Sequence, residues 1–304
     1  MRCASRTARR TAGVLALFLA SAGLSAQEYE TAVVVSGLER PTGITVQGNQ
    51  TLFFTQLPTP GVPGSMGGTN TVNRIVLGAG EVETLTTGEP EPTNLALGPD
   101  GILYWTCKSA NVILERSRSG EVSLFLGGLA RPSGISIGRD GDVYFTQLPT
   151  PGVSGMMGGT NTVNVSDGKS IQTLTMGEPE PTDIAVAKDG TVYWTCKTAN
   201  VILRRSPEGV VSLLLGSLDS PVGIALDHQD RKLFFTEVPT PGVSSRMGGR
   251  NKVNELDLES MALTIVDFGD PEPTDVAVAR NGHVYWTCSS AGVIVEATPV
   301  PAGQ

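Results

Sequence analysis

The strongest constraint on the fold is an internal repeat, because three long stretches of the chain align with one another. A Pro-x-Gly-Ile motif begins at Pro41, Pro132 and Pro221. A second motif, Pro-Thr followed by Asn or Asp, begins at Pro92, Pro181 and Pro273. The two series alternate, so the chain contains six units arranged as three pairs. Repeats of this size indicate a propeller or a solenoid and outweigh any local pattern.

Each unit reads as four short strands. In the fourth unit a strand leads to the turn Asp189-Gly190, and the run Val192–Thr195 is aromatic and β-branched. Two more strands follow at 200–204 and 210–215, which gives a four-stranded sheet in about 40 residues, the size of a propeller blade. Helical periodicity is absent after the first 26 residues. The sequence therefore predicts an all-β, six-bladed β-propeller of three two-blade repeats, at about residues 41–131, 132–220 and 221–304.

The two ends of the chain predict how the ring closes. The last unit ends after a third strand near 293–296, whereas an extra strand precedes the first unit. Counted back from the following proline, residues 33–35 align with 124–126 and 213–215, which are outer strands. We therefore expect residues 31–36 to complete the last blade, which removes open sheet edges.

The first 26 residues have the pattern of a signal peptide. Four arginines precede an apolar run at 12–19 that is too short to span a bilayer. Leu24-Ser25-Ala26 is the expected cleavage site, with Ala20-Ser21-Ala22 as the alternative. We expect a propeller domain at 27–304 that is secreted or periplasmic and has no membrane span. The net charge of -8 makes nucleic acid and anionic lipid poor partners.

Residues 181–196, which read PTDIAVAKDGTVYWTC, resemble blades of the NHL-repeat and SMP-30/gluconolactonase-like propellers. The resemblance covers nearly all of the chain after the first 26 residues. It implies the propeller fold but not one activity, because that superfamily includes calcium-dependent lactonases and propellers that only bind ligands.

The residues before the six prolines form a candidate ligand site. They are expected to surround the channel on the loop face, which carries the loops that enter the inner strands and those that join the second and third strands of each blade. In blade order these ring residues are Arg40, Glu91, Arg131, Glu180, Ser220 and Glu272. One interpretation is a ring of ion pairs that fixes the spacing of the blades. The other is a binding site for a ligand.

Ser220 breaks the alternation of charge in this ring. It replaces the third arginine, so Glu180 and Glu272 flank a position without a cation. Asp183 and Asp275 add oxygen ligands nearby, whereas the first repeat has the neutral Asn94. Glu180, Asp183, Glu272 and Asp275 are therefore candidate ligands of a hard cation such as Ca²⁺.

A Trp-Thr-Cys motif ends the second strand of alternate blades. Its cysteines are Cys107, Cys196 and Cys288, an odd set that argues against a disulfide framework. The second strand lies outside the first, so these thiols are expected to pack rather than to share a metal ion. The lysines that follow two of them, Lys108 and Lys197, are further candidate ligand contacts.

A third feature, the Pro-Thr-Pro-Gly-Val loops near residues 58–70, 149–161 and 239–251, could wall the channel mouth or pack over neighbouring blades.

Three functions fit these patterns. The leading hypothesis is a non-catalytic propeller that binds a small-molecule or cationic ligand on the loop face, because the candidate residues repeat threefold and catalysis usually needs different groups in different roles. The alternative implied by the resemblance is a calcium-dependent hydrolase such as a lactonase, in which Glu180 or Glu272 activates water. The third repeat does break the symmetry, with Glu237 in place of a glutamine and a new Lys252. A protein-assembly scaffold is a further alternative.

Overall fold

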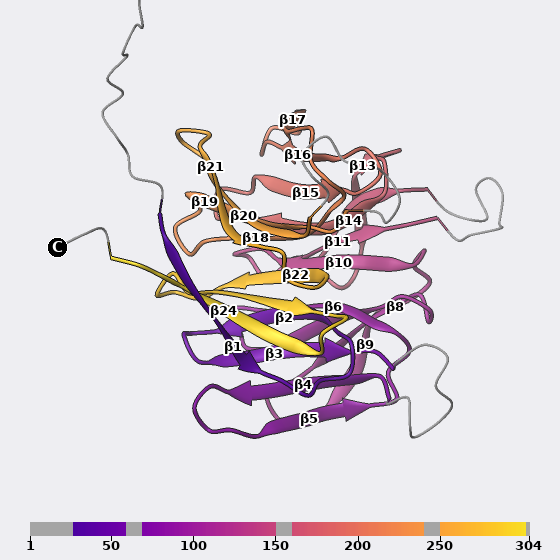
Figure 1. Cartoon of the computed structure of the whole chain (residues 1–304). Helices are drawn as coiled ribbons and strands as arrows, with labels where there is room; N and C mark the ends of the chain where they lie inside the picture. The colour runs from indigo at the N-terminus through magenta and orange to yellow at the C-terminus, as the bar shows by residue number, and fades with distance from the viewer. Residues whose placement is uncertain (1–26, 59–68, 150–159, 240–249, 302–304) are drawn as a thin grey trace, which may run out of the picture.

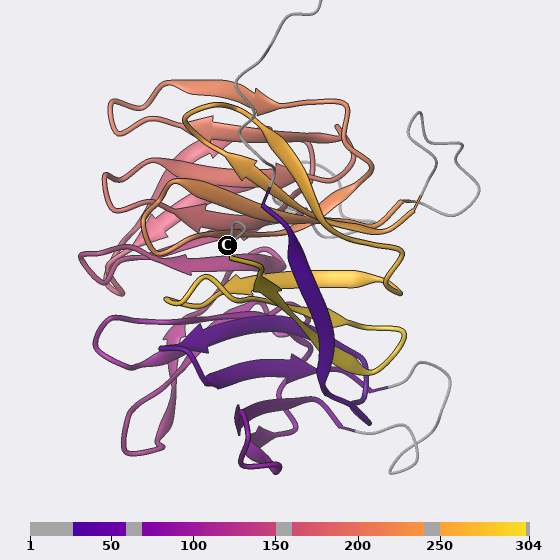
Figure 2. The same ribbon diagram turned by 60° about the vertical axis from the view of Figure 1, so that its left-hand side comes forward.

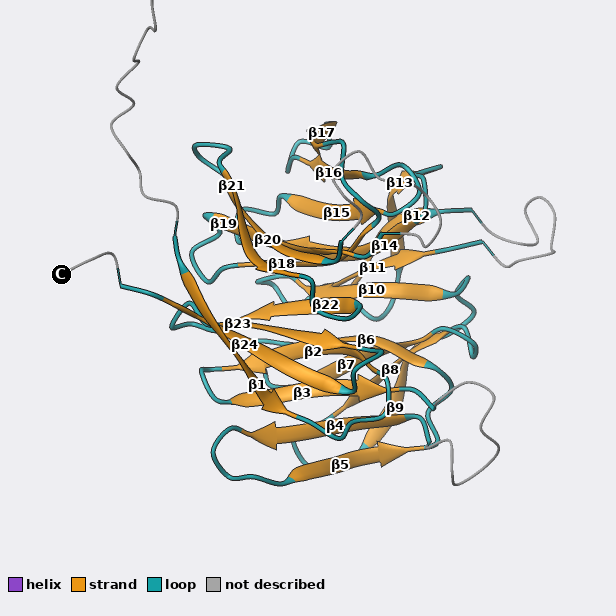
Figure 3. Cartoon of the chain, viewed as in Figure 1, coloured by secondary structure: helices purple, strands orange, loops and turns teal. Residues whose placement is uncertain are grey.

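The computed structural model of the chain describes residues 27–58, 69–149, 160–239 and 250–301 (Figure 1). Its regular elements are all strands in these ranges, and they form six four-stranded antiparallel sheets (Figure 3). The innermost strands contact one another in sequence around a closed ring. The prediction of a six-bladed β-propeller is confirmed. No helix long and apolar enough to cross a membrane occurs in the described part of the chain.

The first five blades are each built from four consecutive strands, from the channel outward. Blade one contains β2 (Pro41–Gln47), β3 (Thr51–Gln56), β4 (Thr71–Val76) and β5 (Val82–Thr87). Blade two contains β6 (Pro92–Leu97), β7 (Leu103–Cys107), β8 (Val112–Arg116) and β9 (Val122–Leu126). Blade three contains β10 (Pro132–Ile137), β11 (Val143–Gln147), β12 (Thr162–Ser166) and β13 (Ile171–Met176). Blade four contains β14 (Pro181–Val186), β15 (Val192–Cys196), β16 (Val201–Arg205) and β17 (Val211–Leu215). Blade five contains β18 (Pro221–Leu226), β19 (Lys232–Glu237), β20 (Lys252–Asp257) and β21 (Leu263–Phe268).

The sixth blade combines the two ends of the chain. It contains β22 (Pro273–Val278), β23 (Val284–Cys288), β24 (Val293–Pro299) and, outermost, β1 (Tyr29–Val35). β1 runs antiparallel to β24, and in Figures 1 and 2 the indigo strand lies against the yellow one. The Tyr29 hydroxyl also donates a hydrogen bond to the Glu255 carboxylate of blade five. The predicted closing strand is therefore present. It pairs with β24 in blade six and also contacts blade five.

A buried threonine occupies the same place in the second strand of each blade, and in four blades its hydroxyl donates to a carbonyl of the next blade. The inner strands are irregular in register just after their first proline, which leaves a backbone N–H without a ladder partner. The Thr195 hydroxyl accepts the Asp183 N–H at 3.1 Å and donates to the Val222 carbonyl of the next blade at 2.7 Å. Five equivalent threonines are also fully buried: Thr55, Thr106, Thr146, Thr236 and Thr287. The Thr195 hydroxyl thus pairs with an N–H group that the irregular register leaves without a ladder partner, and it joins two sheets at once.

Hydrophobic clusters fill the spaces between the blades. The largest buried side chains include Trp105, Trp194 and Trp286, one in each repeat. Each tryptophan packs in the same cluster as the cysteine that follows it two residues later. Burial between the sheets therefore stabilises the ring, as expected for a chain whose three described cysteines are free.

Candidate functional site

The six ring residues on the loop face share a left-handed backbone conformation. Their φ angles are 29° at Arg40, 40° at Arg131, 46° at Glu180 and 52° at Glu91, Ser220 and Glu272. This conformation costs a non-glycine residue about 1 kcal/mol or more. It aims each carbonyl at the N–H that follows the second strand, as in the bond from Lys197 N–H to the Glu180 carbonyl at 3.2 Å. The ring positions are thus fixed by the backbone of the bulge.

The arginine side chains of the ring contact the long loops. Nη1 of Arg40 donates to the Pro58 carbonyl at 3.1 Å, and Nη1 of Arg131 donates to the Pro149 carbonyl at 3.2 Å. Within the described ranges, no ion pair joins a ring arginine to a ring glutamate. Ser220 keeps the local backbone geometry, because its N–H donates to Asn200 Oδ1 at 2.9 Å. Ligand binding at this position stays a prediction.

Lys108 is part of a charged surface on the loop face. Burial lowers the pKa of Lys108, the nearby Arg131 guanidinium lowers it further, and the Glu91 and Glu180 carboxylates raise it. Candidate residues from blades two, three and four therefore lie close enough to influence one another electrostatically. The remainder of the Pro-Thr-Pro-Gly-Val loops, residues 59–68, 150–159 and 240–249, lies outside the described residues.

Asp183 and Asp275 lie deeper in the channel than the ring glutamates, three residues further along their strands. Asp183 Oδ2 accepts the Ile224 N–H at 2.8 Å, and Asp275 Oδ2 accepts the Ile44 N–H at 2.8 Å. The two carboxyl groups are hydrogen-bonded to each other. Asn94, the equivalent residue of the first repeat, donates from Nδ2 to Asp183 Oδ1 at 2.8 Å. One position of each repeat thus meets at the propeller axis.

This carboxyl pair holds a proton. Burial raises the pKa of Asp183 to about 7, although backbone N–H groups that bond to the carboxylate lower it. Burial and the Asp183 charge raise the pKa of Asp275 well above its usual range. Two carboxyl groups in hydrogen-bond contact cannot both be ionised without strong repulsion, so one donates to the other. The proton relieves the repulsion between these two carboxyl groups, whereas a cation between Glu180 and Glu272 stays a prediction.

Glycines of the odd blades make room for these axial residues. A Cβ atom at Gly134 would lie 2.4 Å from the Cα of Asp183, and one at Gly223 would lie 2.6 Å from the Cα of Asp275. Each aspartate therefore contacts the preceding blade through a glycine and accepts a hydrogen bond from the following blade. This explains the glycine of the Pro-x-Gly-Ile motif by close backbone approach.

The donor set does not fit a calcium ion. Ca²⁺ takes six to eight oxygen ligands, whereas the Asp183 and Asp275 carboxyl groups already accept hydrogen bonds from backbone N–H groups and bond to each other. In the described part of the chain, no group of three or more His, Cys, Asp or Glu side chains could hold a metal ion.

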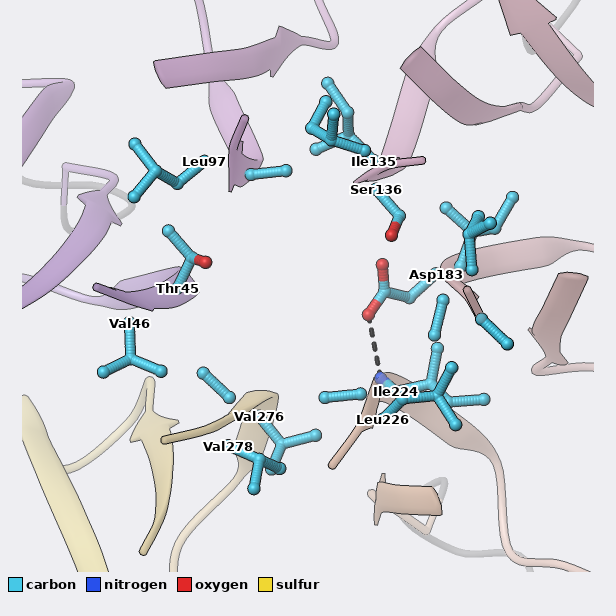
Figure 4. Close-up of a pocket in the computed structure, with 18 of the residues that line it drawn as sticks. Thr45, Val46, Leu97, Ile135, Ser136, Asp183, Ile224, Leu226, Val276 and Val278 are labelled. Carbon is cyan, nitrogen blue, oxygen red and sulfur yellow. Dashed lines mark hydrogen bonds between the residues drawn. The ribbon is translucent and has the colours of Figure 1, made fainter. Parts of the chain in front are cut away.

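A cavity of about 640 Å³ extends along the axis, and the Asp183–Asp275 pair and Asn94 line it. It reaches the turn face, which carries the loops between the first and second strands of each blade. Its lining is mixed: Leu97, Ile137, Leu226 and Val278 are apolar wall residues, and the polar residues Arg139, Lys188, His228 and Asp230 line its outer end. Figure 4 shows the Asp183 carboxyl group pointing into the space beside Ser136.

Sequence reasoning missed this cavity because the turn-face residues read as ordinary turns. A signal was present in the inner strands, where one equivalent position is small in every blade. The residues at that position are Thr45, Ala96, Ser136, Ala185, Ala225 and Ala277.

The unusual residues of the third repeat form a buried ion pair. Lys252 Nζ lies 3.5 Å from Glu237 Oε2 and 3.4 Å from Asp219 Oδ2. The first repeat has neutral partners at the equivalent places, where Gln56 Nε2 donates to Thr71 Oγ1 at 3.4 Å. Compared with the first repeat, the third repeat thus replaces a neutral pair of side chains with the charged pair Glu237–Lys252.

The three thiols do not form a site. Cys107, Cys196 and Cys288 are fully buried and belong to three different hydrophobic clusters. Burial raises the pKa of each thiol to about 12. These surroundings support the packing role that the sequence predicts.

Comparison with known proteins gives one family. The family model described as the virginiamycin B lyase family matches residues 25–299. Among solved structures, virginiamycin B lyase from Staphylococcus aureus, in a catalytically inactive histidine-to-alanine variant with quinupristin, is similar with a TM-score of 0.60 and 18% identity, over 90% of this chain and 100% of that one. A gluconolactonase from Xanthomonas campestris has a TM-score of 0.54 and 14% identity, over 88% and 89%. The protein cueball of Anopheles gambiae is 29% identical over 114 residues, which are 36% of this chain and 15% of that protein. The gluconolactonase-like resemblance is confirmed at the level of the fold.

Proposed function

This chain belongs to the virginiamycin B lyase family, and from that premise we propose that it binds a small molecule in the axial cavity of the propeller. The observation that carries the proposal is a cavity of about 640 Å³ with both apolar and polar lining residues, among them the Asp183–Asp275 pair. Ligand sites in proteins are typically of this size, with apolar walls and a few polar groups that orient the ligand.

The histidines of this chain weigh against the chemistry of the Staphylococcus aureus enzyme. That enzyme is catalytically inactive when one histidine is replaced by alanine. The present sequence contains two histidines, His228 and His283. His283 Nδ1 is bonded to Glu296 at 2.8 Å in blade six, and His228 is exposed at the turn face. Neither lies beside the Asp183–Asp275 pair, which supports binding over a histidine-dependent lyase reaction.

A second candidate function is proton-transfer catalysis by the Asp183–Asp275 pair. A carboxyl group whose pKa is raised to about 7 can accept or donate a proton near neutral pH. This is the function that the family's lyase activity favours. The calcium-dependent hydrolase that uses Glu180 or Glu272 has less support, because the described residues gather no calcium ligands.

The location outside the cytoplasm is part of the proposal. Residues 1–26 lie outside the described residues. The first interactions of the folded domain begin at Gln27, whose Nε2 donates to the Val300 carbonyl at 2.8 Å. Cleavage after Ala26 leaves these interactions intact. Sequencing the N-terminus of the exported protein tests this, and Gln27 is the expected first residue.

A cavity-filling variant tests the binding proposal. Ser136→Trp places an indole in the axial cavity, whereas Ser123→Trp adds the same group to the exposed outer strand β9. Small molecules, quinupristin among them, are screened by thermal shift against the wild type and both variants. Binders lost in Ser136→Trp and kept in Ser123→Trp support the axial site. Binders kept equally in both variants contradict it.

The same screen separates binding from catalysis. Each binder is incubated with wild type and with Asp183→Asn, and the mixture is followed by liquid chromatography. An unchanged ligand indicates a binding protein. Turnover that Asp183→Asn abolishes, in a variant that still binds, favours the proton-transfer enzyme instead.

A further inference from the structure

A second hollow of about 840 Å³ lies on the turn face beside the axial cavity, at blades one and two. Its lining includes the side chains of Arg74, Arg116, Arg118 and Arg280, together with His228. No aspartate or glutamate is among the described residues that line it. A groove with four arginines is unexpected in a chain of net charge -8. We infer that this basic groove binds a small molecule that carries an oxyanion group, such as a phosphate or a cluster of carboxylates.

The repeat supplies an internal comparison for the groove. Arg74, Arg116 and Arg118 lie where blade one meets blade two. In the pair of blades three and four, the register of the strands places Val165 and Arg205 at the first two positions, and the repeat places Pro207 at the third. In the pair of blades five and six, the corresponding residues are Glu255, Ala297 and Pro299. The formal charge at these positions falls from +3 to +1 to -1, so the groove is specific to the first pair of blades.

Three of the four guanidinium groups are free of acidic partners. Arg74 forms an ion pair with Glu83 at 2.5 Å, whereas no ion pair of Arg116, Arg118 or Arg280 occurs in the described ranges. Asp100, in the adjacent turn, uses Oδ1 to accept the Ile102 N–H at 3.1 Å. Unpaired arginines that line one concave surface repel one another, and an anion relieves this repulsion.

Two of these guanidinium groups lie against glycine backbone. A Cβ at Gly101 would lie 2.7 Å from Arg118 Nε, and a Cβ at Gly120 would lie 3.0 Å from an Nη of Arg116. The glycines therefore let the planar groups pack closely on the turns, which limits their freedom before a ligand binds. Preorganised, planar donors of this kind suit the bidentate recognition of phosphate and carboxylate oxygens.

The ligand class follows from the size and surroundings of the groove. Its volume admits a small molecule, and the acidic protein as a whole repels long polyanions such as nucleic acid. The groove and the axial cavity share lining residues that include Leu97, Ile137 and Leu226. The inference does not depend on what occupies the axial cavity, because Asp183 and Ser136 line that cavity alone.

Calorimetric titration of inorganic pyrophosphate and of citrate into the protein tests the inference, at an ionic strength matched with chloride. We expect one site for at least one of these probes, and which probe binds identifies phosphate or carboxylate as the preferred group. Arg116→Gln and Arg118→Gln should each weaken binding by about tenfold, because each removes a charge-assisted hydrogen bond.

The control is Arg205→Gln, which alters the equivalent strand position in blade four, outside the groove. It should leave the affinity unchanged. Ser136→Trp should also leave it unchanged, so failure of the axial-cavity proposal is seen separately. The inference is overturned if neither probe binds the wild type, or if Arg205→Gln weakens binding as much as Arg116→Gln and Arg118→Gln do. Arg118 is exposed, so its variant keeps the test valid if Arg116→Gln does not fold.

Discussion

Gly134 and Asp183 approach so closely that a Cβ on the glycine would lie 2.4 Å from the aspartate Cα. Gly134→Ala should therefore lower the free energy of unfolding by about 3 kcal/mol, because the contact is with backbone that cannot move aside. Gly127→Ala is the matched control, since the nearest atom to its Cβ would be 3.6 Å away. Urea unfolding measures both variants. Equal stability of the two would mean that the blades can separate at the axis without cost.

The Asp183–Asp275 pair should make stability depend on pH. Burial raises the pKa of Asp183 to about 7 in the folded state, above the ordinary 3.8 of an aspartate, so the folded state binds the proton more tightly. Its contribution is complete below about pH 4 and is lost as the pH rises toward 7, with a slope of up to about 1.4 kcal/mol per pH unit for one proton. Asp275→Asn replaces the repelling carboxyl group with an amide donor and should flatten this slope. Asp267, whose pKa burial raises to about 6, titrates in the same window, so the comparison with Asp275→Asn isolates the pair.

The Glu237–Lys252 pair should behave as one coupled unit. Lys252→Thr leaves a buried carboxylate with less compensation and should destabilise the protein by about 3 kcal/mol or more. The double variant Glu237→Gln, Lys252→Thr recreates the neutral pair of the first two repeats and should recover most of that loss. A double-mutant cycle in chemical denaturation measures the coupling. Additive effects of the two changes would contradict the coupled exchange.

The buried cysteines should be chemically silent in the folded protein. Their thiols are fully buried and burial raises each pKa to about 12, so almost no thiolate exists near neutral pH. A maleimide should label none of Cys107, Cys196 and Cys288 without denaturant and all three in urea, as counted by mass spectrometry. Rapid labelling of one thiol in the native protein would show that its blade opens.

Removing the closing strand should destroy cooperative folding. Deletion of residues 27–36 leaves β24 as an open edge and also removes the Tyr29 contact with blade five. We expect aggregation on size-exclusion chromatography and a broad thermal transition. Tyr29→Phe removes only one hydrogen bond and should remain monomeric, which separates the role of the strand from that of the side chain. A deletion variant with an unchanged melting temperature would rule out this closure.

The repeat made the architecture predictable from the sequence. Equivalent prolines, turns and strand lengths recur in each unit. The last unit lacks a fourth strand and an extra strand precedes the first unit, so the extra strand is expected to complete the last blade. The closure of the ring by the N-terminal strand, which pairs with β24, follows from that count. These are local patterns copied along the chain, so a single sequence is enough to detect them.

The interior of the channel was not predictable in the same way. Asp183 and Asp275 are far apart in sequence, and their contact depends on how the bulge after each proline turns the side chain toward the axis. The basic groove was hidden for a different reason. Net charge is a sum over the chain, whereas Arg74, Arg118 and Arg280 come from three blades and gather only when the ring is closed.

The pairing of β1 with β24 has a consequence for how the protein is made. During synthesis the strand at Tyr29–Val35 emerges before all the other strands of the propeller, and its partner at Val293–Pro299 emerges after them. Every other pair of strands within a blade is adjacent in the sequence. Five blades can therefore form while β1 is still unpaired. Contacts between such distant segments form slowly, and an unpaired strand is open to aggregation in the meantime. The step that completes the ring is therefore also the step before which the chain is most exposed to aggregation.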